Sequence, residues 1–527
     1  MAVTEAAEPQ AAAAAAGTDA DDAVEVGGLA GLLGSADHLV IGRLFVATSL
    51  LMLIVGRVAG LLVDVERVDT SSLSILDEYA GQVFSLHLVA DPLLFLVPAF
   101  LGIAIAIVPL QIGAATVAFP RAVAASYWAW LLSSGVLLAG YLVDGGPAGV
   151  GTDRDGVLLW IVGLGGALGA LLVATVCLLT TVLTLRTAGM SLDRVPMFTW
   201  TSFVAGVVWL VSLPVAVAVL VLNYLDVRYG AGVGVDSQLW WVFGAPQVFA
   251  FALPALGLLL DAVPVAAGAR LRSRGVLLAA VVVAGLLTFG ADLLAAGEDP
   301  SILGDALYVG GSIALLLPLL VIAGGVAEAA RRGTLALSSP VVFGFLSLLL
   351  LLAAAVVNAV RVIDSLDLIG TSADAAVREL VVVAGLLGVA GAAHYWATKL
   401  FGTQLKEGLG RFAALVVFVG GLAVGVPDLI SGFLDQPDGI AELASVEDGV
   451  EALNVVTALG GLVVLAGVAL VIANLLTGRS DGEVPADPWD GHTLEWATAS
   501  PPILGAQGPI EAVTSATPLL DTKEAQA

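Results

Sequence analysis

Ionisable side chains are rare inside the long apolar stretches of this chain, and the few that occur there are the ones that could do chemistry. Arg57, His87, Asp91, Asp292 and Arg378 lie within or at the edge of such stretches. His87 and Asp91 are four residues apart, so they share one face of a helix. A charge at the centre of a bilayer costs at least about 2.5–3.5 kcal/mol on insertion scales. The pattern favours a buried ion-pair network, a proton path or a substrate site, and a purely structural Asp–Arg pair fits it equally well.

The elements that must position these residues are apolar helices long enough to cross a membrane. The chain has 527 residues, of which 59% are hydrophobic and 12% charged, against roughly 45–50% and about 25% in soluble proteins. A helix needs about 20 apolar residues to span a bilayer. We predict an all-α integral membrane protein with twelve transmembrane helices, at 38–63, 83–109, 123–144, 156–184, 198–224, 238–268, 275–297, 305–329, 338–362, 377–401, 409–433 and 450–477.

The charge and the single cysteine exclude several classes of site. Twenty Lys and Arg against 45 Asp and Glu give a net charge of −25, and binding to nucleic acid needs the opposite sign. Cys177 is the only cysteine, which excludes a disulfide framework and a zinc or iron–sulfur site built from cysteines.

The few basic residues predict the orientation of the chain. The loops after the even-numbered helices carry Arg121, Arg186, Arg194, Arg270, Arg272, Arg274, Arg331, Arg332, Lys399, Lys406 and Arg411. The opposite loops carry Arg67, Arg154, Arg228 and Arg361. This bias predicts a multi-pass protein of the cell membrane with both termini in the cytoplasm. The outer loops are rich in Asp and Glu, which could attract a basic soluble partner or simply keep that face solvated.

Composition divides the chain into three parts. Residues 1–36 are rich in Ala, Asp and Glu without a basic start or an early apolar run, so we predict a disordered acidic N-terminal arm and no signal peptide. Residues 37–478 form the twelve-helix transmembrane domain. Residues 479–527 form a cytoplasmic C-terminal tail.

Several longer strings carry a family resemblance. They are VPLQIGA at 108–114, AFPR at 118–121, SYW at 126–128, DHLVIG at 37–42, GMSL at 189–192, DPW at 487–489, TLEWA at 493–497 and SPP at 500–502. In their order along the chain they resemble subunit I of the heme–copper oxidases, the cytochrome c oxidase family. The resemblance covers about residues 37–502 and implies that family's twelve-helix bundle in the lipid bilayer, beside other respiratory oxidase subunits.

The family's chemistry requires six histidines, and this chain has four. Two imidazoles hold a low-spin heme, one holds the oxygen-binding heme, and three hold a copper ion. The chain contains His38, His87, His394 and His492. His87 matches the family's ligand on the second helix. The other three have no metal-ligand spacing to one another, and we interpret them as structural or surface residues.

The resemblance places other residues where the family keeps its functional ones. FGAPQVF at 243–249 resembles the family's Gly-His-Pro-Glu-Val-Tyr motif, which puts Ala245 at a copper ligand, Gln247 at the glutamate and Phe249 at the tyrosine. The remaining histidine pairs fall on Ala291 and Asp292 and on Ala376 and Arg378. The two proton-path entries fall on Thr116 and about Ile322, and the two arginines for the heme propionates fall on Asp438 and Gly439.

These departures predict a degenerate family member with no catalytic residues, no copper and no heme. Heme held by His87 alone is the alternative, with Arg378 on the opposite side of the iron, where a guanidinium cannot act as ligand. We further predict that Arg378 reaches across the former heme plane to Asp91, with His87 beside them and Arg57 filling part of the space. Such a pair would let two charges persist at that depth.

Three functions follow as hypotheses. The first is a non-catalytic structural or regulatory subunit of a respiratory membrane complex. The second is an electron-transfer or terminal oxidase subunit that uses heme on His87. The third is an ion or proton transporter built on Asp91, Asp292 and Arg378, which would require a continuous polar route.

Overall fold

The computed structural model describes most of the predicted membrane domain and much of the tail. The described residues are 31, 33–68, 75–76, 79–147, 149–234, 236–289, 302–439, 449–478, 484–503 and 512–526. Nearly all of the predicted acidic arm, and the predicted positions Ala291 and Asp292, lie outside these residues.

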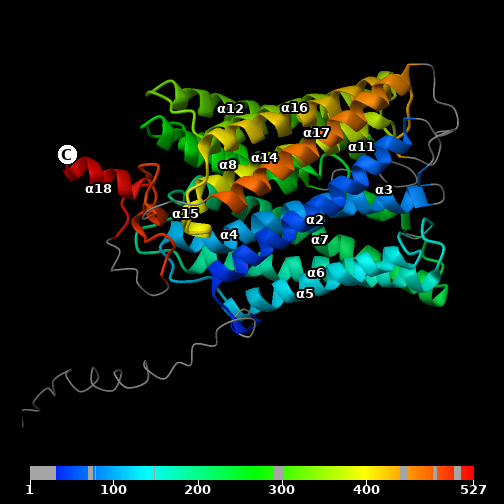
Figure 1. The fold of residues 1–527 in the computed structure, drawn as a ribbon, viewed down its shortest axis with the longest axis horizontal. Coiled ribbons are helices and arrows are strands. Elements are labelled where there is room, and N and C mark those ends of the chain that lie inside the picture. The colour runs from blue at the N-terminus through cyan, green and yellow to red at the C-terminus, as the bar shows by residue number, and fades with distance from the viewer. Residues whose placement is uncertain are drawn as a thin grey trace, which may run out of the picture.

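Long helices run side by side along one axis (Figure 1). Those that build the bundle are α2 (His38–Glu66), α3 (Ala80–Val89), η2 (Ala90–Leu96), α4 (Val97–Ile112), α5 (Pro120–Leu142), α6 (Arg154–Thr184), α7 (Met197–Tyr229), α8 (Phe249–Ala266), α9 (Arg274–Thr288), α11 (Ile302–Ala314), α12 (Leu316–Ala330), α13 (Ser339–Arg361), α14 (Ser372–Tyr395), α16 (Glu407–Gly432) and α17 (Val450–Thr477). Short elements are η3 (Asp236–Val242), η4 (Asp364–Leu366), α15 (Ala397–Leu400), η6 (Leu494–Ala497) and α18 (Pro518–Gln526).

The predicted all-α membrane bundle is confirmed. Among the described residues, 11 helices are long and apolar enough to cross a membrane, and Arg274–Thr288 is a shorter apolar helix at the place of the predicted seventh. The predicted helix at 238–268 is shorter than expected, because the chain turns at Gly244 and Pro246 before α8 begins. The predicted helix at 377–401 begins earlier, at Ser372, where the Thr371 side chain accepts a hydrogen bond from the Ala373 N–H.

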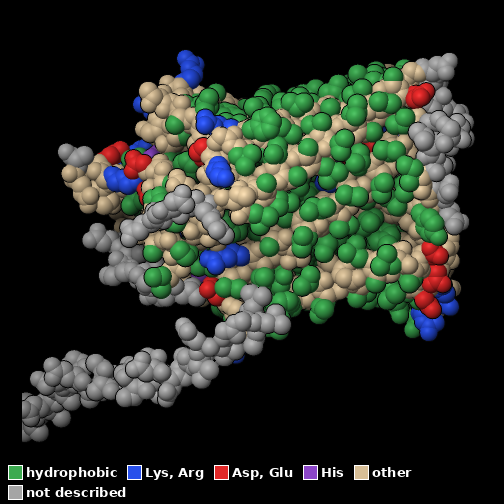
Figure 2. All heavy atoms as spheres, viewed as in Figure 1, with side chains coloured by type: hydrophobic (Ala, Val, Ile, Leu, Met, Phe, Trp, Pro, Cys, Tyr) green, Lys and Arg blue, Asp and Glu red, His purple; other side chains and the backbone are tan. Residues whose placement is uncertain are grey.

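The two ends of the bundle differ in charge. We call the end where α2 begins and the C-terminal tail packs the terminus side, and the opposite end the loop side. Figure 2 shows a broad hydrophobic band between them, with most of the visible Lys and Arg near the terminus side and Asp and Glu prominent on the loop side. A band of apolar side chains facing outward is what a bilayer requires of a spanning bundle.

Two buried helical segments form the centre of the bundle. In the span Ala80–Ile112, which joins α3, η2 and α4, the most apolar window is 100% buried, and in α14 it is 89% buried. Helix α2 lies against α4 where two glycines meet, since a Cβ on Gly42 would lie 2.5 Å from the Gly102 carbonyl oxygen. These three close neighbours, α2, the α3–α4 span and α14, carry the candidate site.

Candidate functional site

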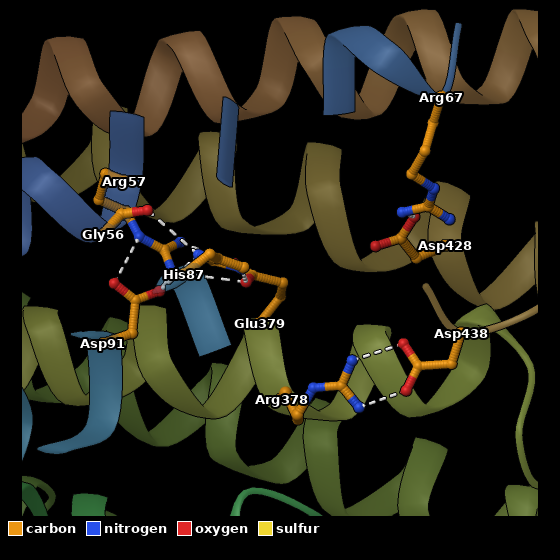
Figure 3. A network of polar contacts seen from close by, with 9 residues as sticks. All are labelled: Gly56, Arg57, Arg67, His87, Asp91, Arg378, Glu379, Asp428 and Asp438. Atoms are coloured by element: carbon orange, nitrogen blue, oxygen red, sulfur yellow. Dashed lines mark hydrogen bonds and ion pairs between the residues drawn. The ribbon is translucent and has the colours of Figure 1, made fainter. Parts of the chain in front are cut away.

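Four side chains from separate parts of the sequence meet between α2, α3–η2 and α14. We call Arg57, His87, Asp91 and Glu379 the charged cluster (Figure 3). Arg57 comes from α2, His87 from α3, Asp91 from η2 and Glu379 from α14. Arg57, Asp91 and Glu379 are buried and His87 is nearly so. The structure therefore brings together three of the predicted network residues and adds Glu379.

Arg57 joins both carboxylates. Its Nη1 lies 2.7 Å from Oε2 of Glu379, its Nε donates to Oδ1 of Asp91 at 3.3 Å, and its Nη2 also pairs with Asp91. A planar guanidinium suits this role because its donors lie in one fork. One cation therefore ties α2 to both η2 and α14.

His87 faces hydrogen-bond acceptors on both sides of its ring. Its Nε2 lies 2.8 Å from Oε1 of Glu379, and its Nδ1 lies 3.2 Å from the Gly56 carbonyl oxygen and 3.1 Å from Oδ2 of Asp91. A neutral imidazole has one donor and one acceptor nitrogen, whereas an imidazolium has two donors. The arrangement is fully satisfied when His87 carries both protons. The cluster then holds two positive and two negative charges.

Local backbone features make room for this cluster. Gly56 and Gly60 are one helical turn apart on α2 and face it: a Cβ on Gly56 would lie 2.3 Å from Oδ1 of Asp91, and one on Gly60 would lie 2.8 Å from the His87 ring. Residues Ala90–Leu96 form a π-helical segment that contains Pro92. Proline removes a backbone donor, and π-helical turns are frequent where a helix must re-aim side chains.

Arg378 has a different partner from the one predicted. It pairs with Asp438, with Nη1 and Nη2 at 2.6 and 2.5 Å from the two carboxylate oxygens. The prediction that Arg378 pairs with Asp91 is therefore wrong. Successive residues of an α-helix point about 100° apart, so Glu379 faces the charged cluster while Arg378 faces Asp438 (Figure 3). Arg57 takes the predicted place of Arg378 beside Asp91. A count of charges could have predicted that Glu379 joins the cluster, because two buried cations near Asp91 need a second carboxylate to balance them.

Two further buried arginines lie toward the loop side. Arg67 follows α2 and pairs with Asp428 of α16 at 3.4 Å. Arg361, predicted to lie in an outer loop, is buried at the end of α13, where it pairs with Asp374 and donates to the Ala245 carbonyl oxygen at 2.9 Å. Sequence reasoning missed this role because Arg361 stands at a helix edge, where a basic residue usually reaches solvent.

Four other positions that the resemblance singled out are packed into the core. Ala245, Gln247, Phe249 and Ala376 are all buried. The Gln247 amide donates to the Ser212 hydroxyl at 3.2 Å. These side chains therefore make ordinary interior contacts where the family carries copper ligands, a glutamate, a tyrosine and a heme ligand.

A second buried polar cluster lies on the terminus side. We call Gln111, Thr199, Asp261, Trp396 and Glu495 the motif cluster, because Gln111 and Glu495 belong to two of the strings quoted above. The Gln111 amide donates to Asp261 at 3.3 Å and to Glu495 at 3.1 Å, and it accepts from Thr199 at 2.7 Å. The Trp396 indole donates to Glu495 at 3.3 Å. Sequence reasoning named these strings but did not predict that they touch.

The remaining histidines are buried. The sequence left open whether they are structural or surface residues, and their burial favours the structural interpretation. His394 Nδ1 lies 2.7 Å from the Ala390 carbonyl oxygen, and its Nε2 lies 3.0 Å from the Asn474 amide nitrogen, which suits a neutral ring. His38 is 1% exposed. His492 is packed in the tail, where burial, with Lys523 nearby, lowers its pKa to about 4.

These side chains, as they lie, do not fit a heme. Both ring nitrogens of His87 already face acceptors, whereas a heme ligand needs one nitrogen free to bind iron. The cavity lined by His87, Asp91, Arg378 and Glu379 has a volume of about 20 Å³, which is room for about one water molecule.

A metal ion fits the charged cluster no better. Ligand atoms of His87, Asp91 and Glu379 lie within 4.8 Å of one another. The Arg57 guanidinium is bonded to both carboxylates in the same space. The position of a cation is thus already taken by a side chain.

The comparisons with known proteins agree with the fold. The family model described as "Cytochrome C and Quinol oxidase polypeptide I" matches residues 40–463. The chain belongs to this family. It is 28% identical to the probable cytochrome c oxidase subunit 1-alpha of Streptomyces coelicolor, over 89% of this chain and 86% of that protein. It is 26% identical to cytochrome c oxidase subunit 1 of Bacillus subtilis, over 89% of this chain and 79% of that protein.

A solved structure shares the fold. It is the cryo-EM structure of a heme–copper terminal oxidase dimer, which matches with a TM-score of 0.71 and 16% identity over 93% of this chain and 89% of that one. The family and fold predicted from the sequence are therefore confirmed, and the chain is a multi-pass membrane protein of the subunit I family.

Proposed function

We propose that this chain is a heme-free and copper-free member of the subunit I family, which serves as a structural or regulatory subunit of a respiratory membrane complex. The observation that carries the proposal is His87. It stands at the family's ligand position on the second helix, yet its two ring nitrogens lie 2.8 Å from Glu379 and 3.1 Å from Asp91. An imidazolium held between two carboxylates has no lone pair for iron.

The Arg378–Asp438 pair supports the same proposal. The resemblance places Arg378 at a heme-ligand position and Asp438 at a propionate-binding arginine. A bound heme would separate such positions, with its iron near one and its propionates near the other. Here the two side chains contact each other directly, at 2.5 and 2.6 Å.

The former copper region gives a parallel argument. At the positions of the copper ligand, the glutamate and the tyrosine the chain has Ala245, Gln247 and Phe249. None of these side chains is a usual copper ligand, since copper prefers imidazole, thiolate and thioether groups. Arg361 adds a positive charge that contacts the Ala245 backbone, which disfavours a cation there.

The transporter alternative receives less support. Its residues Asp91 and Arg378 lie in different ion pairs, and Asp292 is outside the described residues. Between the charged cluster and the motif cluster, every residue from Leu93 to Val108 is buried and apolar. In the described part of the chain, that stretch offers no polar side chain for an ion or a proton along the α4 span.

The proposed setting is the cell membrane, with both termini in the cytoplasm and other respiratory oxidase subunits as neighbours. The excess of Lys and Arg on the terminus side supports this orientation. A basic soluble partner on the opposite face stays a secondary proposal. Two acids on the loop side, Asp428 and Asp438, are engaged in internal ion pairs, so that surface is less negative than the sequence alone indicates.

A visible spectrum of the purified chain, reduced minus oxidised, with heme extraction and copper analysis on the same sample, tests the proposal. We expect no Soret band, no extractable heme and no copper. About one heme per chain, lost in the His87→Ala variant, would overturn it. Affinity purification from native membranes tests the partner: recovery of other oxidase subunits with the wild-type chain is expected, and its isolation without them would contradict a subunit role.

A further inference from the structure

A cavity of about 190 Å³ lies on the terminus side, between the end of α8, the loop before α9 and the C-terminal tail. Its polar lining comes from Asp261, Arg270, Arg274, His492, Thr493, Ser515 and Thr517. Apolar residues of α8 and the loop, such as Leu260 and Leu271, complete the wall. The cavity is thus lined by two arginines and three hydroxyls at one end of the hydrophobic band.

The last helix already presents acids to this site. Arg270 lies 2.6 Å from Oδ1 of Asp521 and 2.7 Å from Oε2 of Glu524, both on α18, and it donates to the Thr517 hydroxyl at 2.9 Å. Figure 1 shows α18 beside the terminus-side ends of the helices, at the C-terminus. These side chains place several oxygens around one guanidinium. A phosphate group can present its oxygens to a guanidinium in the same way.

The other groups in the wall leave the cavity positive. Arg274 donates to the backbone carbonyls of Asp193, at 2.9 Å, and of Val195, so main-chain oxygens fix its position without cancelling its charge. The lowered pKa of His492 keeps that ring neutral at neutral pH. Asp261 is the opposing charge, but its carboxylate is turned to the N–H groups of Met197 and Phe198, at 2.8 and 2.9 Å.

We propose that this cavity binds a phosphate group through Arg270 and Arg274, and that Asp521 and Glu524 of α18 compete for the same place. The acidic last helix then acts as a displaceable cover over the site. The inference does not depend on whether the chain holds heme. Two sources share this chemistry, the headgroup of an anionic phospholipid and a soluble phosphate, and basic pockets at the cytoplasmic ends of membrane helices are known to take lipid headgroups.

The test uses the full chain in nanodiscs of phosphatidylcholine and measures binding of radiolabelled inorganic phosphate by equilibrium dialysis. The Asp521→Asn/Glu524→Gln variant removes the competing charges and is expected to bind phosphate about tenfold more tightly than the wild type. Arg270→Gln, added to that variant, is expected to abolish binding. Arg272→Gln is the matched control, because Arg272 is exposed in the same loop and does not line the cavity.

A second arm replaces part of the phosphatidylcholine with phosphatidic acid and measures the lipid retained after detergent exchange by mass spectrometry. Retention of phosphatidic acid that requires Arg270 supports the lipid source, whereas binding of inorganic phosphate in phosphatidylcholine alone supports the soluble source. The proposal is overturned if the Asp521→Asn/Glu524→Gln variant binds neither probe. It is also overturned if Arg272→Gln and Arg270→Gln lose binding equally.

Discussion

The charged cluster and the motif cluster are both buried and polar, and both join distant parts of the sequence, but they differ in how their charges are satisfied. In the charged cluster, Arg57 and His87 face Asp91 and Glu379. In the motif cluster, two acids, Asp261 and Glu495, share the donors of an amide and an indole. The first is held by ion pairs and the second by hydrogen bonds to neutral groups.

The two clusters also differ in their relation to the family resemblance. The motif cluster is built partly from strings that resemble the family. Through Glu495 it joins the C-terminal tail to Gln111 at the end of α4 and to Trp396 just after α14, and Gln111 also bonds Asp261 of α8. The charged cluster stands where the resemblance expects a heme. Buried ion pairs join the helices there, while hydrogen bonds join the tail to the helices at the other end.

Substitution of Arg57 should lower the stability of the folded chain more than any of the other changes below. In Arg57→Gln, Asp91 and Glu379 stay buried without a full cation between them, and breaking a buried pair in this way costs about 3–5 kcal/mol. Thermal unfolding in detergent should show a large loss of stability. Arg121→Gln is the control, because Arg121 is exposed, and should change stability by no more than about 0.5 kcal/mol. Equal stability of the two variants would contradict an ion-pair lock.

The motif cluster should respond to pH instead. Glu495 is fully buried on η6, and burial, with the charge of Asp261, raises its pKa to about 7 from an ordinary 4.5. The folded chain then binds more protons than the unfolded one between these values. Tail docking should therefore be strongest below about pH 4.5 and weaken as the pH rises to about 7, by about 3 kcal/mol at most.

Hydrogen exchange of residues 484–503 across this pH range measures the effect. The Glu495→Gln variant keeps an acceptor for Gln111 and Trp396 but cannot ionise, so its tail should show no such dependence. Lys399 is the nearby cation, and its nitrogen lies 5.5 Å from the Trp496 ring centroid. A pH dependence that persists in Glu495→Gln would assign the effect to another group and weaken the contrast between the two clusters.

The charge on His87 that its contacts favour gives a smaller, sharper test. His87→Gln removes a cation, leaves the cluster with a net negative charge and should cost about 1.5–3 kcal/mol. Adding Glu379→Gln removes one negative charge, so the cluster is again neutral, and it should recover part of the lost stability. His394→Gln is the matched control, because His394 is neutral and lies between a carbonyl and an amide. If the double variant is no more stable than His87→Gln, the charge assignment is wrong.

Much of the fold could be predicted from the sequence because hydropathy reports directly on membrane helices. The errors occurred where polar residues enter a helix. The first turn of α14 contains Asp374, and Arg378 and Glu379 follow, so a hydropathy pattern starts the helix too late. Their partners, Asp438 among them, come from distant segments.

The charged cluster was only partly predictable for the same reason. His87 and Asp91 are linked by spacing along one helix, and the structure places both with Arg57. The choice between Arg57 and Arg378 as the partner of Asp91 depends on helix rotation, which sequence does not specify. Glu379 stands beside Arg378 at the start of the predicted helix, and the sequence alone does not show that the two side chains face different partners.

A glycine substitution gives the smallest expected effect and tests how tightly the charged cluster is packed. In Gly60→Ala the new Cβ would lie 2.8 Å from the His87 ring, and overpacking of this kind costs about 1–3 kcal/mol. Gly135→Ala is the control, since a Cβ there meets no atom within 4 Å, and alanine in a helix should be neutral or stabilising by up to about 1 kcal/mol. Thermal unfolding compares the two. If Gly60→Ala is as stable as Gly135→Ala, the His87 ring can move aside, and the cluster is less rigidly held than its short contacts indicate.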